Sequence, residues 1–132
     1  MSMDVQRLID DALKEIETIS AQQAMARLGD PDVVFVDLRD SAELAASGQV
    51  PDAFHMPRGN LEFWIDKQSK YHKPIFDSGK QFIFYCAADL RSTLATATAR
   101  QMGLERVCHI TGGFQAWRDA GGPVQQKTEN PA

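Results

Sequence analysis

Apolar residues recur along the chain in two rhythms, and each rhythm predicts a different kind of element. Near the N-terminus the apolar positions follow the 3.6-residue period of one helix face, which predicts an amphipathic helix. These positions are Val5, Leu8, Ile9, Ala12, Leu13 and Ile16. Three later runs, at residues 33–36, 81–85 and 107–110, are short and almost continuously apolar. Such runs predict strands that are covered on both faces, as in a parallel sheet.

The segments between these strands carry helix patterns and stop signals. Ser20 and Gln23 have the spacing of a capping box before a helix at 21–28, and Asp40 or Ser41 is suited to cap a helix at 43–46. The remaining predictions are helices at 61–66, 92–102 and 114–120, a small strand at 53–55 and a long surface loop at 68–80. Alternation of strands and helices predicts an α/β fold with a mainly parallel sheet.

Composition narrows the function classes. The 132 residues suffice for one domain with a sizeable core. A net charge of −4 argues against a nucleic-acid or anionic-membrane partner, which would require a basic face. No apolar run approaches a membrane span, and the N-terminal segment lacks the apolar core of a signal peptide, so the cytoplasm is the expected location.

The two cysteines and three histidines are scattered, which is a poor zinc signature. A disulfide between Cys86 and Cys108 is not excluded by the sequence, although it is uncommon in a cytosolic chain. Cys108 lies in the middle of a predicted strand, where a buried inert thiol is expected. Cys86, at a strand end, is the candidate for a reactive thiol.

The segment around Cys86 carries the clearest chemical signal. A predicted strand ends at this thiol, a short loop leads to Arg91, and a helix follows. Backbone N–H groups at a helix N-terminus attract anions and favour the thiolate form, which is the nucleophile. The N–H groups of residues 87–91 would form a nest for an anion, and the small side chains of Ala87 and Ala88 leave that backbone accessible. Arg91 would bind an oxyanion with two parallel hydrogen bonds.

Several motifs, in this order and spacing, resemble the rhodanese family. They are Val36-Asp37-Leu38-Arg39, Glu43, Gly48-Gln49-Val50-Pro51-Asp52-Ala53, Pro57-Arg58-Gly59, the loop Cys86-Ala87-Ala88-Asp89-Leu90-Arg91-Ser92, Gly112-Gly113-Phe114-Gln115-Ala116-Trp117 and Ala120-Gly121-Gly122-Pro123-Val124. The resemblance covers the chain from about Ile19 to Val124. It suggests an N-terminal helical extension at 1–18, a rhodanese domain at 19–124 and a polar tail at 125–132.

The resemblance implies a three-layer fold, with a central sheet of about five mainly parallel strands and helices on both faces. It also implies a single-domain sulfurtransferase that uses no metal and no organic cofactor. In this family the loop cysteine takes a sulfane sulfur from a donor such as thiosulfate and holds it as a persulfide. The sulfur then passes to a thiophilic acceptor, such as cyanide, a small thiol or a protein. Here Cys86 and Arg91 would be catalytic, and Ala87, Ala88, Asp89, Leu90 and Ser92 would form the anion-binding loop.

Two positions depart from the family pattern. Asp89 stands where active members often have glycine. Its carboxylate either caps the following helix, which is the interpretation slightly favoured, or repels an anionic donor. The two effects can coexist, and we expect modest thiosulfate activity. Gln49 replaces a common histidine in a predicted turn.

Other polar and aromatic residues near the predicted site have ordinary structural explanations. Asp37 and Arg39 are expected to form a structural salt bridge, with substrate contact as the alternative, and Arg58 either extends a positive rim or braces a loop. His55 and His109 are expected to be hydrogen-bonded structural residues. Phe114 and Trp117 are expected to anchor the core, and Trp64 is expected to pack there, with a substrate mouth as its alternative.

Two rivals to the sulfurtransferase remain open. The first is a non-catalytic rhodanese-like module that binds a partner protein, which the unusual Asp89 keeps in contention. The second is a cysteine-based phosphatase or an arsenate reductase. Four residues separate Cys86 from Arg91, whereas the loop of cysteine-based phosphatases is one residue longer and accommodates a phosphate. The shorter loop resembles that of sulfurtransferases, whose pocket suits a sulfur atom rather than a phosphate.

Overall fold

The computed structural model describes residues 2–127 and 130. The elements in chain order are α1 (Val5–Leu13), β1 (Glu17–Ile19), α2 (Ala21–Met25), β2 (Val33–Asp37), α3 (Ser41–Ser47), β3 (Phe54–His55), the 3₁₀ turn η1 (Arg58–Asn60), α4 (Leu61–Ile65), the 3₁₀ turn η2 (Pro74–Asp77), β4 (Gln81–Tyr85), α5 (Leu90–Gln101), β5 (Val107–Ile110) and α6 (Gly113–Asp119). The prediction of an α/β fold is confirmed.

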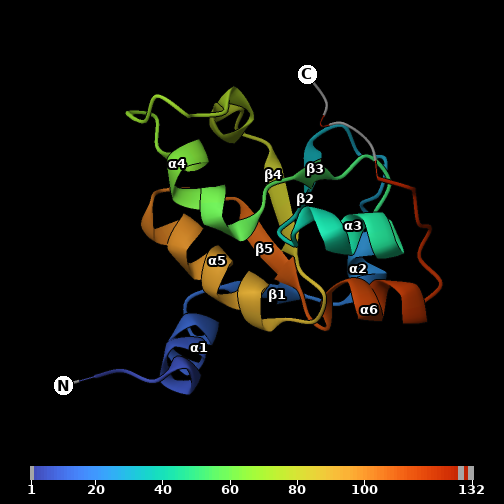
Figure 1. Cartoon of the computed structure of the whole chain (residues 1–132), viewed down its shortest axis with the longest axis horizontal. Helices are drawn as coiled ribbons and strands as arrows, with labels where there is room; N and C mark the ends of the chain where they lie inside the picture. Colours follow the sequence, from blue (N-terminus) through green and yellow to red (C-terminus); the bar gives the residue numbers. More distant parts are fainter. Residues whose placement is uncertain (1, 128–129, 131–132) are drawn as a thin grey trace.

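The five strands form one parallel sheet in the order β1-β5-β4-β2-β3. β4 lies at its centre, paired residue for residue with β2 from Val33 opposite Gln81 to Asp37 opposite Tyr85. Since all five strands point the same way, the ends of β2 and β4 meet at one edge (Figure 1). That edge carries both the Asp37–Arg39 segment and Cys86.

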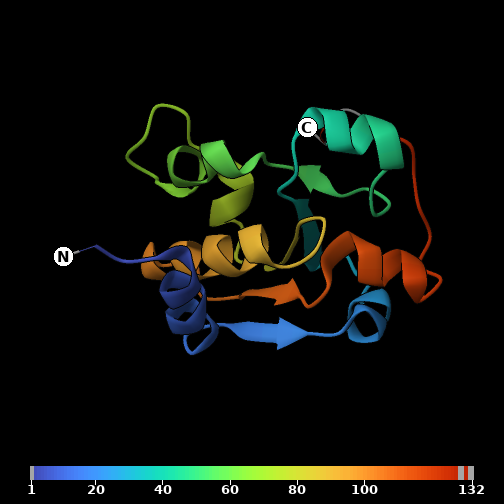
Figure 2. The ribbon, with the colours of Figure 1, turned by 60° about the horizontal axis from the view of Figure 1, so that its bottom comes forward.

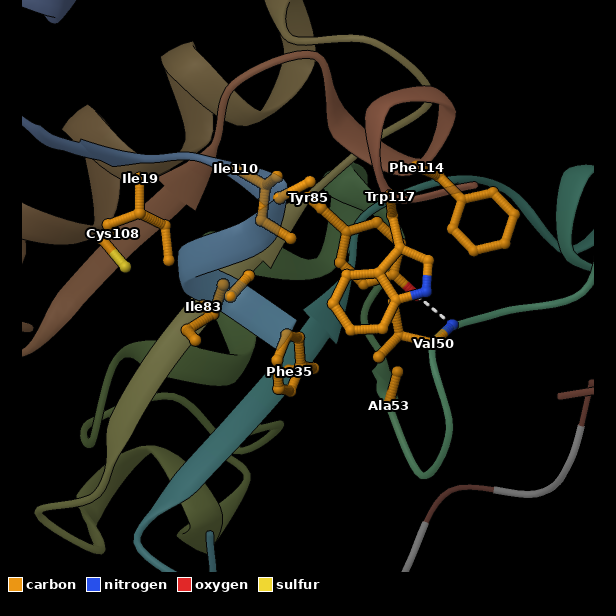
Figure 3. Packing of buried hydrophobic residues seen from close by; sticks show 12 residues of the cluster. Ile19, Phe35, Val50, Ala53, Ile83, Tyr85, Cys108, Ile110, Phe114 and Trp117 are labelled. Carbon is orange, nitrogen blue, oxygen red and sulfur yellow. Dashed lines mark hydrogen bonds between the residues drawn. The ribbon is translucent and has the colours of Figure 1, made fainter. Parts of the chain in front are cut away.

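Helices cover both faces of the sheet, which makes three layers (Figures 1 and 2). On one face α4, α5 and η2 pack against apolar side chains of the strands, including Val36, Phe82 and Phe84. On the other face α2 and α6 bury a second cluster, drawn in Figure 3. The strands therefore have apolar residues on both faces, which is why their sequence runs do not alternate.

The predicted aromatic anchors of α6 are confirmed. Trp117 is fully buried, meets the Phe35 ring edge-on at 5.6 Å between ring centroids, and donates its indole N–H to the Pro123 carbonyl at 2.7 Å. Phe114 stacks on Tyr85, whose hydroxyl accepts the Val50 N–H at 3.1 Å (Figure 3). This packing fixes α6 against the carboxyl end of β4, where the predicted site lies.

The N-terminal segment differs from its prediction in two ways. α1 ends at Leu13, and only Ile9 and Ala12 of its apolar positions are buried, while Val5, Leu8 and Leu13 are exposed. The next residues form the edge strand β1, which the sequence did not predict because three residues are too few to show a period. The boundary suggested after residue 18 falls inside this strand. α1 itself packs against α5 (Figure 2).

Elsewhere the predicted elements are present, with shifted ends. The Ser20–Gln23 capping box is formed, and Asp40 is the residue that caps α3. The predicted loop 68–80 contains η2, whose Phe76 is buried. Trp64 packs edge-on against Phe54, as its structural explanation predicted.

The start of the predicted polar tail is tied to the fold. Gln125 exchanges two backbone hydrogen bonds with Gln49, each 2.8 Å long. Gln49, the second departure from the family pattern, is buried, and its side-chain amide donates to the Ala53 carbonyl. Tail residues 128, 129, 131 and 132 lie outside the described part of the chain.

Candidate functional site

Cys86 follows the last residue of the central strand β4 and lies at the base of a loop. Its side chain is buried, with only 1% of the residue exposed, and its Sγ accepts the backbone N–H of Ser92 at 3.3 Å. The loop turns into α5 at Asp89, so the first turn of that helix lies against the sulfur. A hydrogen bond from a backbone N–H stabilises a sulfur that carries negative charge.

The other N–H groups of the loop are unpaired. Among the described residues, none accepts a hydrogen bond from the backbone N–H groups of residues 87–91. Successive free N–H groups ahead of a helix form a concave anion-binding surface. These N–H groups are therefore available for the predicted anion nest, in the loop that begins at Cys86.

The loop is held from behind by the start of α6. The N–H groups of Phe114 and Gln115 donate to the carbonyls of Cys86 and Ala87, at 2.8 and 3.1 Å. Gly113 passes so close that a Cβ there would overlap the carbonyl oxygens of Ala88 and Cys86. Gly113 thus allows α6 to pack directly against the thiol loop, a role that was not predicted for it.

The slightly favoured interpretation of Asp89 is wrong in one respect. Asp89 is the N-cap residue of α5 by position, but its side chain makes no capping hydrogen bond. Its backbone carbonyl accepts instead, from the Thr93 N–H at 2.9 Å and the Thr93 hydroxyl at 2.7 Å. These bonds involve only the Asp89 carbonyl, so no side chain caps the start of α5, and the Asp89 carboxylate has no hydrogen-bond partner among the described residues.

Arg91 points its guanidinium at Glu43, a residue of the family motifs that was not predicted to belong to the site. The two form a bidentate pair, with Nη1 to Oε1 at 2.8 Å and Nη2 to Oε2 at 2.9 Å. The hydrogen bonds from Arg91 lower the pKa of Glu43 to about 2. The same bonds raise the pKa of Arg91, and its proximity to Cys86 adds to that effect. The predicted anion clamp thus already holds an internal carboxylate.

Asp37 and Arg39 form the expected structural salt bridge. The pair is almost completely buried, with Arg39 Nη2 2.7 Å from Asp37 Oδ2. Arg39 also donates to the Ser47 hydroxyl and the Gly48 carbonyl, and its guanidinium lies 4.3 Å from the centroid of the Phe114 ring. These contacts tie β2, α3 and α6 together behind the loop. Arg58, in η1, pairs instead with Glu62 in α4.

His109 and His55 are hydrogen-bonded, as expected. His55 Nε2 lies 2.7 Å from the Arg39 carbonyl. His109 is buried on β5, with Nδ1 3.0 Å from the Ser92 hydroxyl and Nε2 3.0 Å from the Thr18 hydroxyl. It therefore contacts the same residue whose N–H meets the Cys86 sulfur.

Two hollows open on the described surface. One, of about 200 Å³, adjoins the catalytic loop and is lined by Arg39, Glu43, Ala46, Ser47, Ala87, Phe114, Gln115 and Arg118. The other, of about 660 Å³, lies at the opposite edge of the sheet, around the starts of β4 and β5. Of these two hollows, the smaller is the one next to the thiol loop.

The second thiol has a different environment. Cys108 is buried in the middle of β5, and burial raises its pKa to about 12. The predicted burial is confirmed, and low reactivity of this thiol stays a prediction. Both cysteines are free thiols. Within the described ranges, no three or more His, Cys, Asp or Glu residues gather to hold a metal ion, and no helix there is both long and apolar enough to cross a bilayer.

Comparison with known proteins agrees with the fold. The model of the rhodanese-like domain matches residues 20–120. A solved structure from Rhodopseudomonas palustris, of unknown function and described as a possible tyrosine phosphatase, is 50% identical over 95% of this chain and 96% of its own, with a TM-score of 0.91. A polysulfide-sulfur transferase homodimer from Wolinella succinogenes is 26% identical over 91% of this chain and 85% of its own, with a TM-score of 0.66.

The curated relatives are longer proteins. The tRNA uridine(34) hydroxylase of Erwinia tasmaniensis is 32% identical over 120 residues, which are 85% of this chain and 32% of that protein. The chain thus spans about a third of the length of the curated relatives that it matches.

Proposed function

The chain belongs to the rhodanese-like family, and from this premise we propose that it is a sulfurtransferase in which Cys86 carries the transferred sulfur. The observation that supports this most directly is the loop itself. It combines a thiol at its base, one N–H on the sulfur and a run of unpaired N–H groups around it. This arrangement suits an atom that gains negative charge while it is bonded to Cys86.

In the first half-reaction, the Cys86 thiolate attacks the outer sulfur of thiosulfate. A sulfur–sulfur bond forms to Cys86, the sulfur–sulfur bond of the donor breaks, and sulfite leaves with the electron pair. The product is a Cys86 persulfide, whose outer sulfur the loop N–H groups would hold. No general base is required if the thiol is ionised beforehand.

In the second half-reaction, a thiophilic acceptor such as cyanide or a thiol attacks the outer sulfur. The bond between the two sulfurs of the persulfide breaks, and Cys86 leaves as the thiolate, ready for another cycle. Arg91 would bind the oxyanion part of the donor in the first step. To do so its guanidinium must exchange the Glu43 carboxylate for the donor.

The burial of Cys86 sets a condition on this mechanism. With 1% of the residue exposed, a donor reaches the sulfur only after the groups that cover it move. The exposed parts of the loop are Ala88 and Leu90, and the Arg91–Glu43 pair is partly exposed. We propose that the donor enters on this side as it displaces Glu43 from Arg91.

Three other functions are less well supported. A phosphatase activity would match the description of the Rhodopseudomonas palustris protein, but the loop has only four residues between Cys86 and Arg91. Hydroxylation of a tRNA uridine belongs to relatives three times as long, and the net charge of −4 is unfavourable for RNA binding. A non-catalytic binding module would not need unpaired N–H groups around a thiol.

Intact-protein mass spectrometry after incubation with thiosulfate tests the proposal. The parent protein should gain the mass of one sulfur atom, and cyanide should remove it with release of thiocyanate. Cys86→Ser should gain none, whereas Cys108→Ser, the matched control, should gain it like the parent. Absence of the adduct in the parent would refute the sulfurtransferase, and phosphate release from an aryl phosphate would favour the phosphatase instead.

A further inference from the structure

A buried hydrogen-bonded chain runs from the surface to the residue that contacts the catalytic sulfur. It begins at the Thr18 hydroxyl on β1, which lies 3.0 Å from His109 Nε2. His109 Nδ1 lies 3.0 Å from the Ser92 hydroxyl, and the backbone N–H of Ser92 donates to Cys86 Sγ at 3.3 Å. Three elements, β1, β5 and α5, therefore converge on the sulfur.

His109 is a buried polar residue whose two ring nitrogens are both hydrogen-bonded. It lies in the central part of β5, between Cys108 and Ile110, and 1% of the residue is exposed. Burying an imidazole costs free energy unless both ring nitrogens are hydrogen-bonded. Both are, and each partner is a hydroxyl from a different element. An apolar side chain would fill a strand position more simply, as Val107 does two residues earlier.

The Ser92 hydroxyl has two hydrogen-bond partners, the Asp89 carbonyl and the His109 ring. The Ser92 hydroxyl lies 3.3 Å from the Asp89 carbonyl and 3.0 Å from His109 Nδ1, so it bridges the start of α5 to β5. The sulfur receives the N–H of this same residue. A shift of Ser92 would therefore move its N–H away from the sulfur and change the backbone at the start of α5, near Asp89.

From this geometry we infer that His109 is a positioning residue for the sulfur-transfer step, acting through Ser92. This inference rests on the proposed function, because it assigns His109 to the chemistry of Cys86. The imidazole holds the Ser92 hydroxyl, and this fixes the N–H that supports negative charge on Sγ. Burial lowers the pKa of His109, while Asp89, the charged group that faces it, opposes this effect. A neutral ring suits a side chain that accepts at one nitrogen and donates at the other.

Two amide substitutions separate this role from simple filling of space. Asn places a polar atom near the site of His Nδ1, within reach of Ser92, whereas Gln places one near the site of Nε2, within reach of Thr18. Both are polar and of similar bulk. If His109 acts through Ser92, His109→Asn should keep much more activity than His109→Gln. If it only fills the core, the two should be impaired alike.

The readout is the rate at which iodoacetamide alkylates Cys86, measured together with sulfur transfer from thiosulfate. His109→Gln should react more slowly than His109→Asn by on the order of tenfold to a hundredfold, the usual effect of a misplaced supporting group. Ser92→Ala, which keeps the N–H but loses the hydroxyl, should resemble His109→Gln, and the double variant should be no slower than either. Thermal unfolding reports whether each variant is folded.

Each outcome decides between the two roles. Equal alkylation rates in His109→Asn and His109→Gln would overturn the inference, and so would a parental rate in Ser92→Ala, even if one histidine variant fails to fold. Alkylation needs no sulfur donor, so it tests His109 whether or not the chain transfers sulfur. Failure of the parent to form a persulfide would instead overturn the proposed function.

Discussion

The Glu43 carboxylate accepts two parallel hydrogen bonds from the Arg91 guanidinium, at 2.8 and 2.9 Å. This is the bidentate geometry in which an arginine binds a carboxylate, phosphate or sulfonate. If Arg91 binds thiosulfate as proposed, the anion must compete with Glu43 for the same guanidinium N–H groups. α3 supplies the competitor and α5 supplies the clamp, from positions that are 48 residues apart.

Glu43→Gln should increase the affinity for thiosulfate. The amide preserves one hydrogen bond to Arg91 and removes the negative charge that the donor must displace. Because the pair is partly exposed, the effect should be modest, with KM falling about two- to fivefold. Steady-state kinetics at constant ionic strength measures it. A KM that stays equal or rises would show that Glu43 positions Arg91 rather than competes for it.

The same pair should make stability depend on pH in acid. The pKa of Glu43 is lowered from 4.5 to about 2 in the folded protein. Its stabilising contribution is therefore fully present above 4.5 and is lost as pH falls toward 2. The parent should be more resistant to urea than Glu43→Gln at about pH 6, and the difference should shrink at about pH 3. A difference that is independent of pH would contradict this linkage.

Gly113→Ala should distort the loop that carries Cys86. The backbone of Gly113 has φ of +58°, and a Cβ there would overlap the carbonyl oxygens of Ala88 and Cys86. Gly29 is a matched control, because it has φ of +86° but no atom within 4 Å of an added Cβ. In Gly29→Ala the free energy of unfolding should fall by only ~1 kcal/mol, because alanine is strained in the left-handed conformation. Urea unfolding measures this loss.

For Gly113→Ala, overpacking should add ~1–3 kcal/mol to that loss of stability. The rate of persulfide formation should also fall, by on the order of tenfold to a hundredfold, since the loop carbonyls would be displaced. Gly29→Ala should keep the parental rate. Equal effects of the two substitutions would show that α6 does not determine the shape of the loop.

Removing the charge of Asp89 should improve the use of thiosulfate. Its side chain makes no capping hydrogen bond, so Asp89→Gly and Asp89→Asn lose little structure while they remove repulsion of the donor. KM should fall about two- to tenfold in both variants. Glu105→Gln removes the same charge at the opposite edge of the sheet, beside the larger hollow, and should change nothing. If the Asp89 variants bind and turn over thiosulfate no better than the parent, the repulsion hypothesis is wrong.

The buried Asp37–Arg39 pair should show the cost of an uncompensated charge. Arg39→Met leaves the Asp37 carboxylate buried without its partner, which should cost ~3–5 kcal/mol of unfolding free energy. The double variant Asp37→Asn/Arg39→Met removes both charges and should regain part of that loss. Urea unfolding of the parent and the two variants measures the difference. A double variant that is less stable than Arg39→Met would contradict this account.

Much of the fold was predictable because its signals are local. The apolar runs before Asp37 and Cys86, the capping residues Ser20 and Asp40, and the helix periods each lie within a few neighbouring residues. β1 was not predicted, because it is only three residues long and most of it is exposed, so it shows no apolar run. Which apolar residues of α1 are exposed depends on how α1 packs against α5, and the helical period of the sequence carries no information on that packing.

For the candidate site too, local features were predictable from the sequence and long-range contacts were not. The order of thiol, short loop, arginine and helix is a property of consecutive residues, and a parallel sheet carries Cys86 to the same edge as Asp37 by topology alone. Sequence was therefore sufficient for the location of the thiol and for the kind of loop around it. The burial of the sulfur, the pairing of Arg91 with Glu43 and the contact between His109 and Ser92 join residues distant in the chain. Such contacts arise only when separate elements pack, because side-chain hydrogen bonds depend on ångström-scale distances that no linear pattern encodes.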